Sequence, residues 1–148
     1  MPIPAFTSDG LLPEGVYDCT VEELRRQFGS FQVSDRRPKL FSQLEAFLAA
    51  ARSSGLVRHV VIDGSFVTAE SKPNDIDLIV IIRADYDFGA DLLPSQYNVL
   101  SKTRVRKRFG FDLVTVREDT SELDEAIAFF ERVRGKPALR KGILKLTL

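Results

Sequence analysis

The apolar residues of the chain fall into segments with helical spacing and segments with the dense hydrophobicity of buried strands. Between about Asp35 and Ser54, apolar side chains recur at positions 40, 41, 44, 47, 48 and 51. This spacing places them on one face of a helix. Pro38 fits in the first turn of that helix, and Ser53-Ser54-Gly55 ends it.

Four segments have the pattern of β-strands, at residues 57–63, 75–83, 111–116 and 142–148. The segment 75–83 is apolar on both faces, which favours a position in the middle of a sheet. The segment 142–148 alternates between apolar and polar residues well enough to form a last strand.

Further helices are expected between these strands. Thr20-Val-Glu-Glu23 has the form of a capping box and begins a short helix that ends near Gln27. Residues 95–108 form another predicted helix. Ser121 is expected to cap a third, whose apolar side consists of Leu123, Ile127, Phe130 and Val133.

Together these segments predict an α/β fold, a small mixed sheet with helices packed on it. Residues 1–19 contain three prolines and two glycines, and we expect them to form an extended N-terminal arm. Residues 20–148 then form a single domain, which is long enough to bury a core. Residues 84–94 and 135–137 are expected to be loops.

Composition and charge narrow the function classes. Lys plus Arg and Asp plus Glu both number 21, so the net charge of zero gives no sign of a nucleic-acid or membrane partner. No leader pattern and no apolar run of membrane-spanning length is present, which favours a cytoplasmic protein. Cys19 is the one cysteine and His59 the one histidine, so neither an internal disulfide nor a Cys/His zinc site is expected. A bound metal would have oxygen ligands.

Asp75 and Asp77 are the first candidates for such ligands. Two residues apart on a strand, they project from the same face with Cα atoms roughly 6.6 Å apart. Carboxylates at that spacing can share a hard cation such as Mg²⁺ or Mn²⁺. Taken alone, the pattern is also compatible with Asp75 capping a loop and Asp77 facing solvent.

Gly64-Ser65 adds a second candidate element. It follows a hydrophobic strand and precedes a short helical turn, so backbone N–H groups and the serine hydroxyl can bind a phosphate there. Alone it is equally an ordinary turn. The combination is more specific: a hydrophobic strand, Gly-Ser, nine residues, and then Asp75-Ile-Asp-Leu78.

This combination resembles the signature of the nucleotidyltransferase superfamily, in which hG[GS] is followed by Dh[DE]h. The superfamily has a third carboxylate on a later strand, and Asp112 in Phe111-Asp-Leu-Val-Thr-Val116 matches it in pattern and spacing. Residues 57–116 therefore resemble the core of a minimal nucleotidyltransferase, the small type often found beside a toxin-like partner. Most of the chain, including Leu12-Pro-Glu-Gly-Val and Lys141-Gly-Ile-Leu-Lys145, resembles a family of bacterial nucleotidyltransferase-like proteins.

The resemblance implies a magnesium-dependent transfer of NMP from a nucleoside triphosphate such as ATP to a hydroxyl on a protein or RNA. It assigns metal binding and catalysis to Asp75, Asp77 and Asp112. Gly64 and Ser65 would bind the nucleotide phosphates. Lys72 could also reach a phosphate, or it could be a solvated loop lysine.

The chain also departs from this family. Minimal nucleotidyltransferases often carry an arginine shortly after Gly-Ser, and residues 66–70 contain none. The chain has no segment that corresponds to the large C-terminal helical domain of many active members. These departures support an alternative, a nucleotidyltransferase-fold protein with little or no turnover that acts as an antitoxin, regulator or nucleotide-binding module.

Two charged segments carry weaker indications. A basic run before Phe109-Gly110 suggests either a solvated helix face or a contact with RNA or an acidic partner. Its members are Lys102, Arg104, Arg106, Lys107 and Arg108. Three acids of the 84–94 loop are expected to be surface charges, with a secondary metal role as the alternative: Asp85, Asp87 and Asp91.

Overall fold

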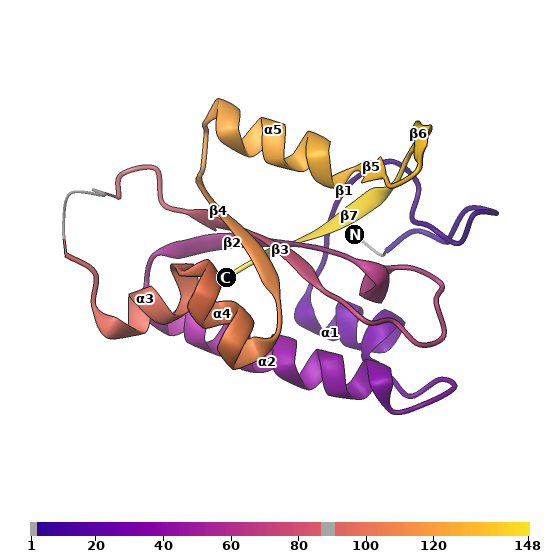
Figure 1. Cartoon of the computed structure of the whole chain (residues 1–148), viewed down its shortest axis with the longest axis horizontal. Helices are drawn as coiled ribbons and strands as arrows, with labels where there is room; N and C mark the ends of the chain where they lie inside the picture. Colours follow the sequence, from indigo (N-terminus) through magenta and orange to yellow (C-terminus); the bar gives the residue numbers. More distant parts are fainter. Residues whose placement is uncertain (1–2, 87–90) are drawn as a thin grey trace.

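A computed structural model of the chain describes residues 3–86 and 91–148 (Figure 1). The strands are β1 (Gly15–Asp18), β2 (Val57–Asp63), β3 (Asp77–Ile82), β4 (Asp112–Arg117), β5 (Arg132–Val133), β6 (Lys136–Arg140) and β7 (Gly142–Thr147). The α-helices are α1 (Val21–Leu24), α2 (Arg36–Ser54), α3 (Pro94–Leu100), α4 (Lys102–Phe109) and α5 (Ser121–Phe130). Two single turns accompany them, the π-helical η1 (Arg25–Gly29) and the 3-10 turn η2 (Ser65–Val67). The predicted mixed α/β fold is confirmed.

The main sheet has the strand order β1-β7-β2-β3-β4, and β5 pairs with β6 in a separate hairpin. β2 is antiparallel to both of its neighbours, whereas β3 pairs with β4, and β1 with β7, in parallel. β3 lies between β2 and β4, as its apolar sequence predicts. β7 enters the sheet between β1 and β2, which separates the N-terminal strand from the centre.

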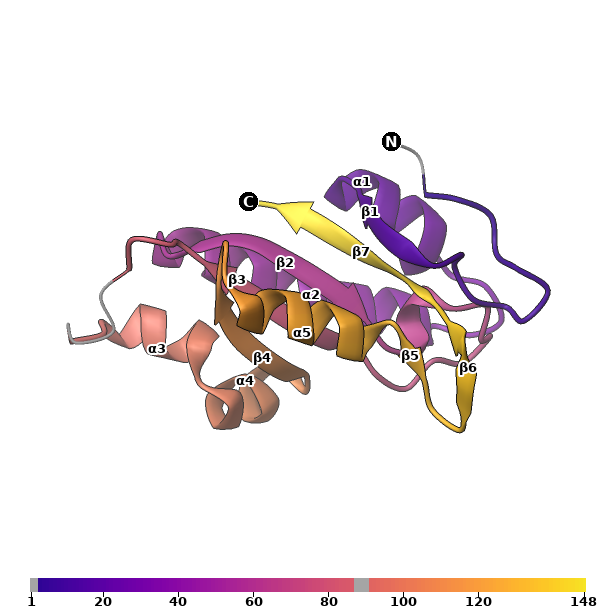
Figure 2. The same ribbon diagram turned by 90° about the horizontal axis from the view of Figure 1, so that it is seen from above.

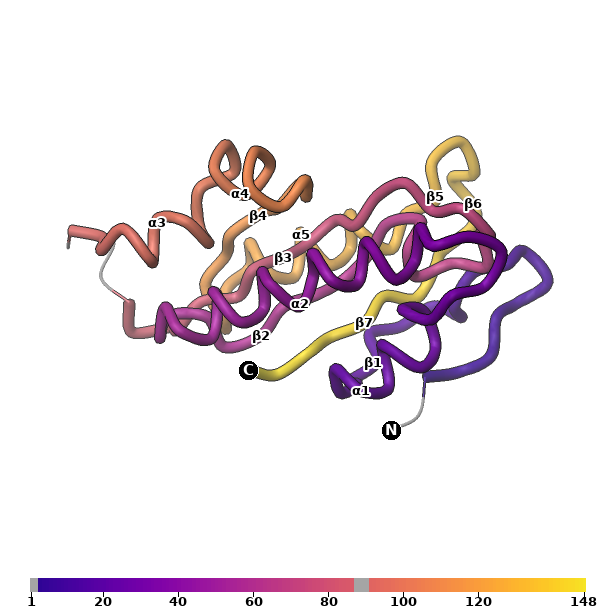
Figure 3. The backbone as a smooth tube through the Cα atoms, turned by 90° about the horizontal axis from the view of Figure 1, so that it is seen from below, coloured from indigo at the N-terminus to yellow at the C-terminus, as the bar shows by residue number. Residues whose placement is uncertain are grey.

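Helices cover both faces of this sheet, and this accounts for the apolar residues on both faces of β3. α2, α3 and α4 lie on one side and α5 on the other (Figures 1 and 2). α2 runs along the underside of β2 and β3 (Figure 3). The alternate residues Leu78, Val80 and Ile82 pack on the α2 side, whereas Ile79 and Ile81 join Ile127 and Phe130 of α5.

Local capping correctly predicted the start of α1 and the end of α2. α1 begins with the capping box formed by Thr20 and Glu23, but the helix predicted to about Gln27 is α-helical only to Leu24 and continues as the π-helical η1 to Gly29. α2 begins after Asp35 and ends at Gly55, whose φ of 72° is the left-handed conformation that glycine adopts without strain.

Several segments differ in detail from the sequence-based expectation. Val133, predicted to lie on the apolar side of the helix that becomes α5, lies in β5, because that helix ends at Phe130. The helix predicted over 95–108 is two helices, because Ser101 has extended backbone (ψ 121°) and its side chain caps α4. Thr120, rather than Ser121, caps α5. The loop predicted at 135–137 is the turn and first residues of a hairpin. Within the expected N-terminal arm, residues 15–18 form β1, which pairs with β7.

Of the predicted 84–94 loop, Asp87 lies outside the described residues. Asp85 pairs with Arg83 and is exposed, as is Asp91. No helix in residues 3–86 and 91–148 has the length and apolar character needed to cross a membrane.

Candidate active site

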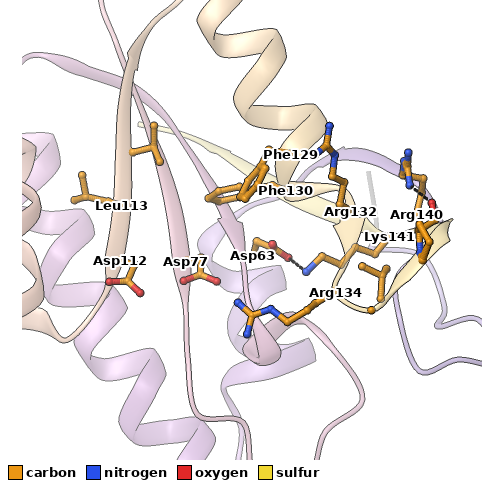
Figure 4. Close-up of a pocket in the computed structure, with 14 residues that line it drawn as sticks. Asp63, Asp77, Asp112, Leu113, Phe129, Phe130, Arg132, Arg134, Arg140 and Lys141 are labelled. Carbon is orange, nitrogen blue, oxygen red and sulfur yellow. Dashed lines mark hydrogen bonds and ion pairs between the residues drawn. The ribbon is translucent and has the colours of Figure 1, made fainter.

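Three aspartates form a row across one end of the neighbouring strands β2, β3 and β4. Asp77, the first residue of β3, is the register partner of Asp63 on β2 and of Asp112 on β4. Register partners project from the same face of a sheet. The face is the one that α5 covers, but the row lies beyond the end of that helix, so the three side chains border a cleft (Figure 4).

Asp75 lies next to this row and is held by Ser65. The Ser65 backbone N–H donates to Asp75 Oδ1 at 2.9 Å, and the Ser65 hydroxyl donates to the same oxygen. That hydroxyl in turn accepts from the N–H groups of Asn74 (2.9 Å) and Asp75 (3.1 Å). The two halves of the sequence motif therefore bind each other, and the anion at the Gly-Ser turn is the carboxylate of Asp75.

Gly64 has a structural role that the sequence did not suggest. Its φ of 96° with ψ near 180° is a conformation that is essentially restricted to glycine. A Cβ at this position would lie 2.8 Å from the carbonyl oxygen of Asp75. We expected the glycine to allow close approach of a phosphate, whereas the structure shows that it allows close approach of the backbone of residues 75–77. The predicted strand that begins at Asp75 begins instead at Asp77, so Asp75 lies just before β3.

The row of aspartates concentrates negative charge. Burial, together with the charges of Asp75, Asp63 and Asp112, raises the pKa of Asp77 to about 6. Burial also raises the pKa of Asp63, whose side chain is only 6% exposed, while the Lys141 ammonium at 3.0 Å opposes that rise. A cation placed at the row would relieve this repulsion, and an all-oxygen set of carboxylates is what Mg²⁺ prefers.

The described part of the chain does not hold three acidic, histidine or cysteine side chains already gathered around one metal position. Two of the predicted ligands have other partners. Asp75 faces Ser65, and Asp112 pairs with Arg106, the one member of the predicted basic run that contacts the row. Metal binding by all three predicted aspartates would require these side chains to turn.

The cleft above the row has a volume of about 740 Å³ and walls of opposite charge. Asp63, Asp77 and Asp112 form its acidic side. The opposite side consists of the end of α5 and the β5–β6 hairpin (Figure 4). The residues on that side include Phe129, Phe130, Arg132, Arg134, Arg140 and Lys141.

Lys72, which we predicted to reach a phosphate, is exposed and does not line this cleft. Cys19 does not line this cleft either, and burial, together with the charges of Glu23 and Asp18, raises the pKa of its thiol to about 12. His59 contacts Thr147 through Nδ1 at 3.1 Å.

Sequence reasoning missed Asp63, Lys141 and the basic hairpin. Asp63 directly precedes Gly64 at the end of a strand, so its position next to the Gly-Ser motif could have indicated a site residue. Its partner Lys141 is 78 residues away and could not be inferred in this way. The hairpin arginines had no such signal, because only the fold brings residues 132–141 to the end of β3.

Arg37 is another residue that the sequence did not single out. Its guanidinium is buried and donates to the carbonyls of Phe66 (2.6 Å), Thr68 (2.8 Å) and Glu70 (2.6 Å). A fourth bond goes to the carbonyl of Phe28. Arg37 thus ties the segment that follows Gly64-Ser65 to α2 and fixes the path of the chain toward Asp75.

Residues 4–147 match the model of a protein family described as a family of unknown function, DUF6932. The chain belongs to this family. The DUF6932 match covers both the aspartate row and the basic hairpin, so the whole cleft lies within the family region. No curated protein and no solved structure matches the chain.

Proposed function

We propose that this DUF6932 protein is a magnesium-dependent nucleotidyltransferase that transfers NMP from a nucleoside triphosphate to a hydroxyl group on a protein or RNA. The observation that carries the proposal is the row formed by Asp77 and Asp112 on neighbouring parallel strands, at the edge of a cleft with a basic opposite wall. The contact between Ser65 and Asp75 adds support, since it joins both halves of the nucleotidyltransferase-like motif in one place.

The chain's own residues then have distinct roles. Asp75 and Asp77 would hold Mg²⁺, and Asp112 would join them once it leaves Arg106. When bound, Mg²⁺ supplies charge neutralisation for the triphosphate and activation of the attacking hydroxyl. Because the pKa of Asp77 is about 6, this carboxylate is ionised at pH 7 and above and is available as a ligand there.

A second candidate function, nucleotide binding with little or no turnover, has its own supporting observation. Asp75 and Asp112 are engaged by Ser65 and Arg106. If these contacts persist when nucleotide binds, the protein would act as a regulator, antitoxin or nucleotide sensor.

Isothermal titration of ATP with and without Mg²⁺ tests the site. We expect Asp77→Asn to abolish the magnesium-dependent part of ATP binding, whereas Glu45→Gln, which removes an exposed carboxylate on α2, leaves it unchanged. Equal binding by wild type and Asp77→Asn would refute the assignment.

Incubation with α-labelled ATP and a cell lysate separates the two candidate functions. Label on an acceptor that disappears with Asp77→Asn supports the transferase. Magnesium-dependent binding without any labelled acceptor supports the binding module.

A further inference from the structure

The β5–β6 hairpin extends from the end of α5 over the aspartate row. Val133 pairs with Lys136, so Arg134 and Gly135 form the turn, and Gly135 has a positive φ (77°), which glycine adopts without strain. The backbone N–H of Lys141 donates to the carbonyl of Glu131 at 2.9 Å and closes the base of the hairpin. The turn residue is therefore held at a defined place beside the cleft.

Three of the four basic side chains on this wall already have partners. Lys141 pairs with Asp63. Arg132 stacks on the ring of Phe129 at 5.8 Å, and Arg140 donates to the carbonyls of Pro137 and Leu139. In Figure 4 the guanidinium groups of Arg132 and Arg140 lie away from the aspartates.

Arg134 differs from these three. Its side chain extends from the turn toward Asp77 and Asp63 (Figure 4), yet among the described residues it has no hydrogen-bond or ion-pair partner. A guanidinium and a crowded carboxylate thus face each other across a cleft of about 740 Å³ without pairing. This arrangement leaves room for a ligand that carries a cation on its acidic side and anionic oxygens on its basic side.

The Gly-Ser turn cannot be the main phosphate-binding site while the Ser65 N–H donates to Asp75. A nucleoside triphosphate in this cleft must find its principal phosphate ligands elsewhere. The planar guanidinium of an arginine suits phosphate oxygens because it can donate two parallel hydrogen bonds.

We propose that the β5–β6 hairpin is the polyphosphate-binding wall of the cleft and that Arg134 is its principal phosphate ligand. This inference rests on the proposed function for the identity of the ligand, a nucleoside triphosphate. It places the phosphate ligand on the hairpin, more than sixty residues after the Gly-Ser motif.

Isothermal titration of inorganic tripolyphosphate in EDTA tests the hairpin without nucleoside or metal. We expect wild type to bind, Arg134→Gln to bind at least about tenfold more weakly, as the loss of charge-assisted hydrogen bonds implies, and Arg134→Lys to retain part of the affinity. Arg52→Gln, which removes an exposed arginine on α2, is the matched control and should bind like wild type. Circular dichroism confirms that each variant is folded.

The proposal is overturned if wild type does not bind, if Arg134→Gln binds equally well, or if Arg52→Gln loses as much affinity. Asp77→Asn should keep its tripolyphosphate binding in EDTA, because it leaves the hairpin intact. Loss of magnesium-dependent ATP binding in Asp77→Asn, with no effect of Arg134→Gln on tripolyphosphate, would refute the hairpin role alone. Unchanged magnesium-dependent ATP binding in Asp77→Asn, with weaker tripolyphosphate binding in Arg134→Gln, would refute the metal site alone.

Discussion

Asp63 and Asp77 are register partners on antiparallel strands, and both carboxylates border one cleft. Lys141 offsets the charge of Asp63, but the charge of Asp77 has no cation of its own among the described residues. A pair of acids in this position costs stability when both are ionised. Such a cost is expected where a site is built to bind a cation rather than to stabilise the fold.

The pH dependence of stability should report this repulsion. Since the folded-state pKa of Asp77 is about 6, above its ordinary value of 3.8, the folded protein binds this proton more tightly than the unfolded chain. The contribution of Asp77 to stability is therefore fully present below about pH 3.8 and is lost as pH rises through about 6. Asp77→Asn removes the loss, and after discounting for solvent screening we expect a gain on the order of 1 kcal/mol, or about 2–4 °C in Tm, at pH 8.

Thermal unfolding of wild type and Asp77→Asn at pH 8 and pH 4.5, without metal, checks this expectation. The difference in Tm should shrink at the lower pH. A variant that is less stable than wild type at pH 8 would show that Asp77 contributes a favourable contact instead.

Replacement of Gly64 should be costly for two reasons. Alanine there adds backbone strain in a conformation nearly restricted to glycine, and it clashes with the carbonyl of Asp75, so we expect a loss of about 3 kcal/mol or more. Gly55→Ala is the comparison, because Gly55 lies in the milder left-handed region and has open space around a Cβ, and it should cost only about 1 kcal/mol. Chemical denaturation measures both losses, and equal losses would contradict the additional cost of strain and contact at Gly64.

The ion pair between Lys141 and Asp63 should contribute to the stability of the fold mainly when Asp63 is charged. Lys141→Met leaves a buried carboxylate without its cation, so we expect a loss of about 3 kcal/mol at pH 8. Removal of Lys141 lets the pKa of Asp63 rise further, and the loss should therefore decrease as pH falls and the carboxyl takes up a proton. The double variant Asp63→Asn/Lys141→Met should recover most of the stability, and a loss that is independent of pH would contradict this account.

Arg37→Met should destabilise the segment that leads to the site. The carbonyls of Phe66, Thr68 and Glu70 lose their donor, and we expect a loss of about 3 kcal/mol or more. Lys39→Met is the control on the same helix, since Lys39 is exposed and pairs with the exposed Asp35, and it should cost less than about 1 kcal/mol. Hydrogen exchange of residues 66–70 should increase in the Arg37 variant only.

Local patterns predicted the elements of this fold well, because most of them are decided by nearby residues. The apolar spacing from Leu40 to Ala51 and the glycine at position 55 are sufficient to place α2. The doubly apolar β3 predicted its own central position. The break at Ser101 was not predictable from helical spacing, since apolar residues continue across it and only the serine cap and extended backbone separate α3 from α4.

The candidate site was predictable in part for the same reason. Asp77 and Asp112 lie on strands that the sequence pattern predicted, and the structure pairs these two strands in parallel. Asp63 and Lys141, which affect the pKa of Asp77, reach it only through strand register and through a segment far along the chain. Arg106, which pairs with Asp112, lies only six residues before it on α4, but the sequence indicated it only as part of a basic run. The hydrogen bond from Ser65 to the carboxylate of Asp75 was also not predictable, because no sequence pattern specifies side-chain geometry.

The insertion of β7 between β1 and β2 has a consequence for folding kinetics. The antiparallel and parallel pairs of β2, β3 and β4 can form while the chain between residues 57 and 117 collapses, but the outer edge of β2 stays open until residues 142–147 arrive. β1 then has to pair with β7 across almost the whole chain, a high-contact-order step that is slow. Refolding should therefore pass through a species with a bare, apolar strand edge, and its yield should fall as protein concentration rises, since such edges associate with one another.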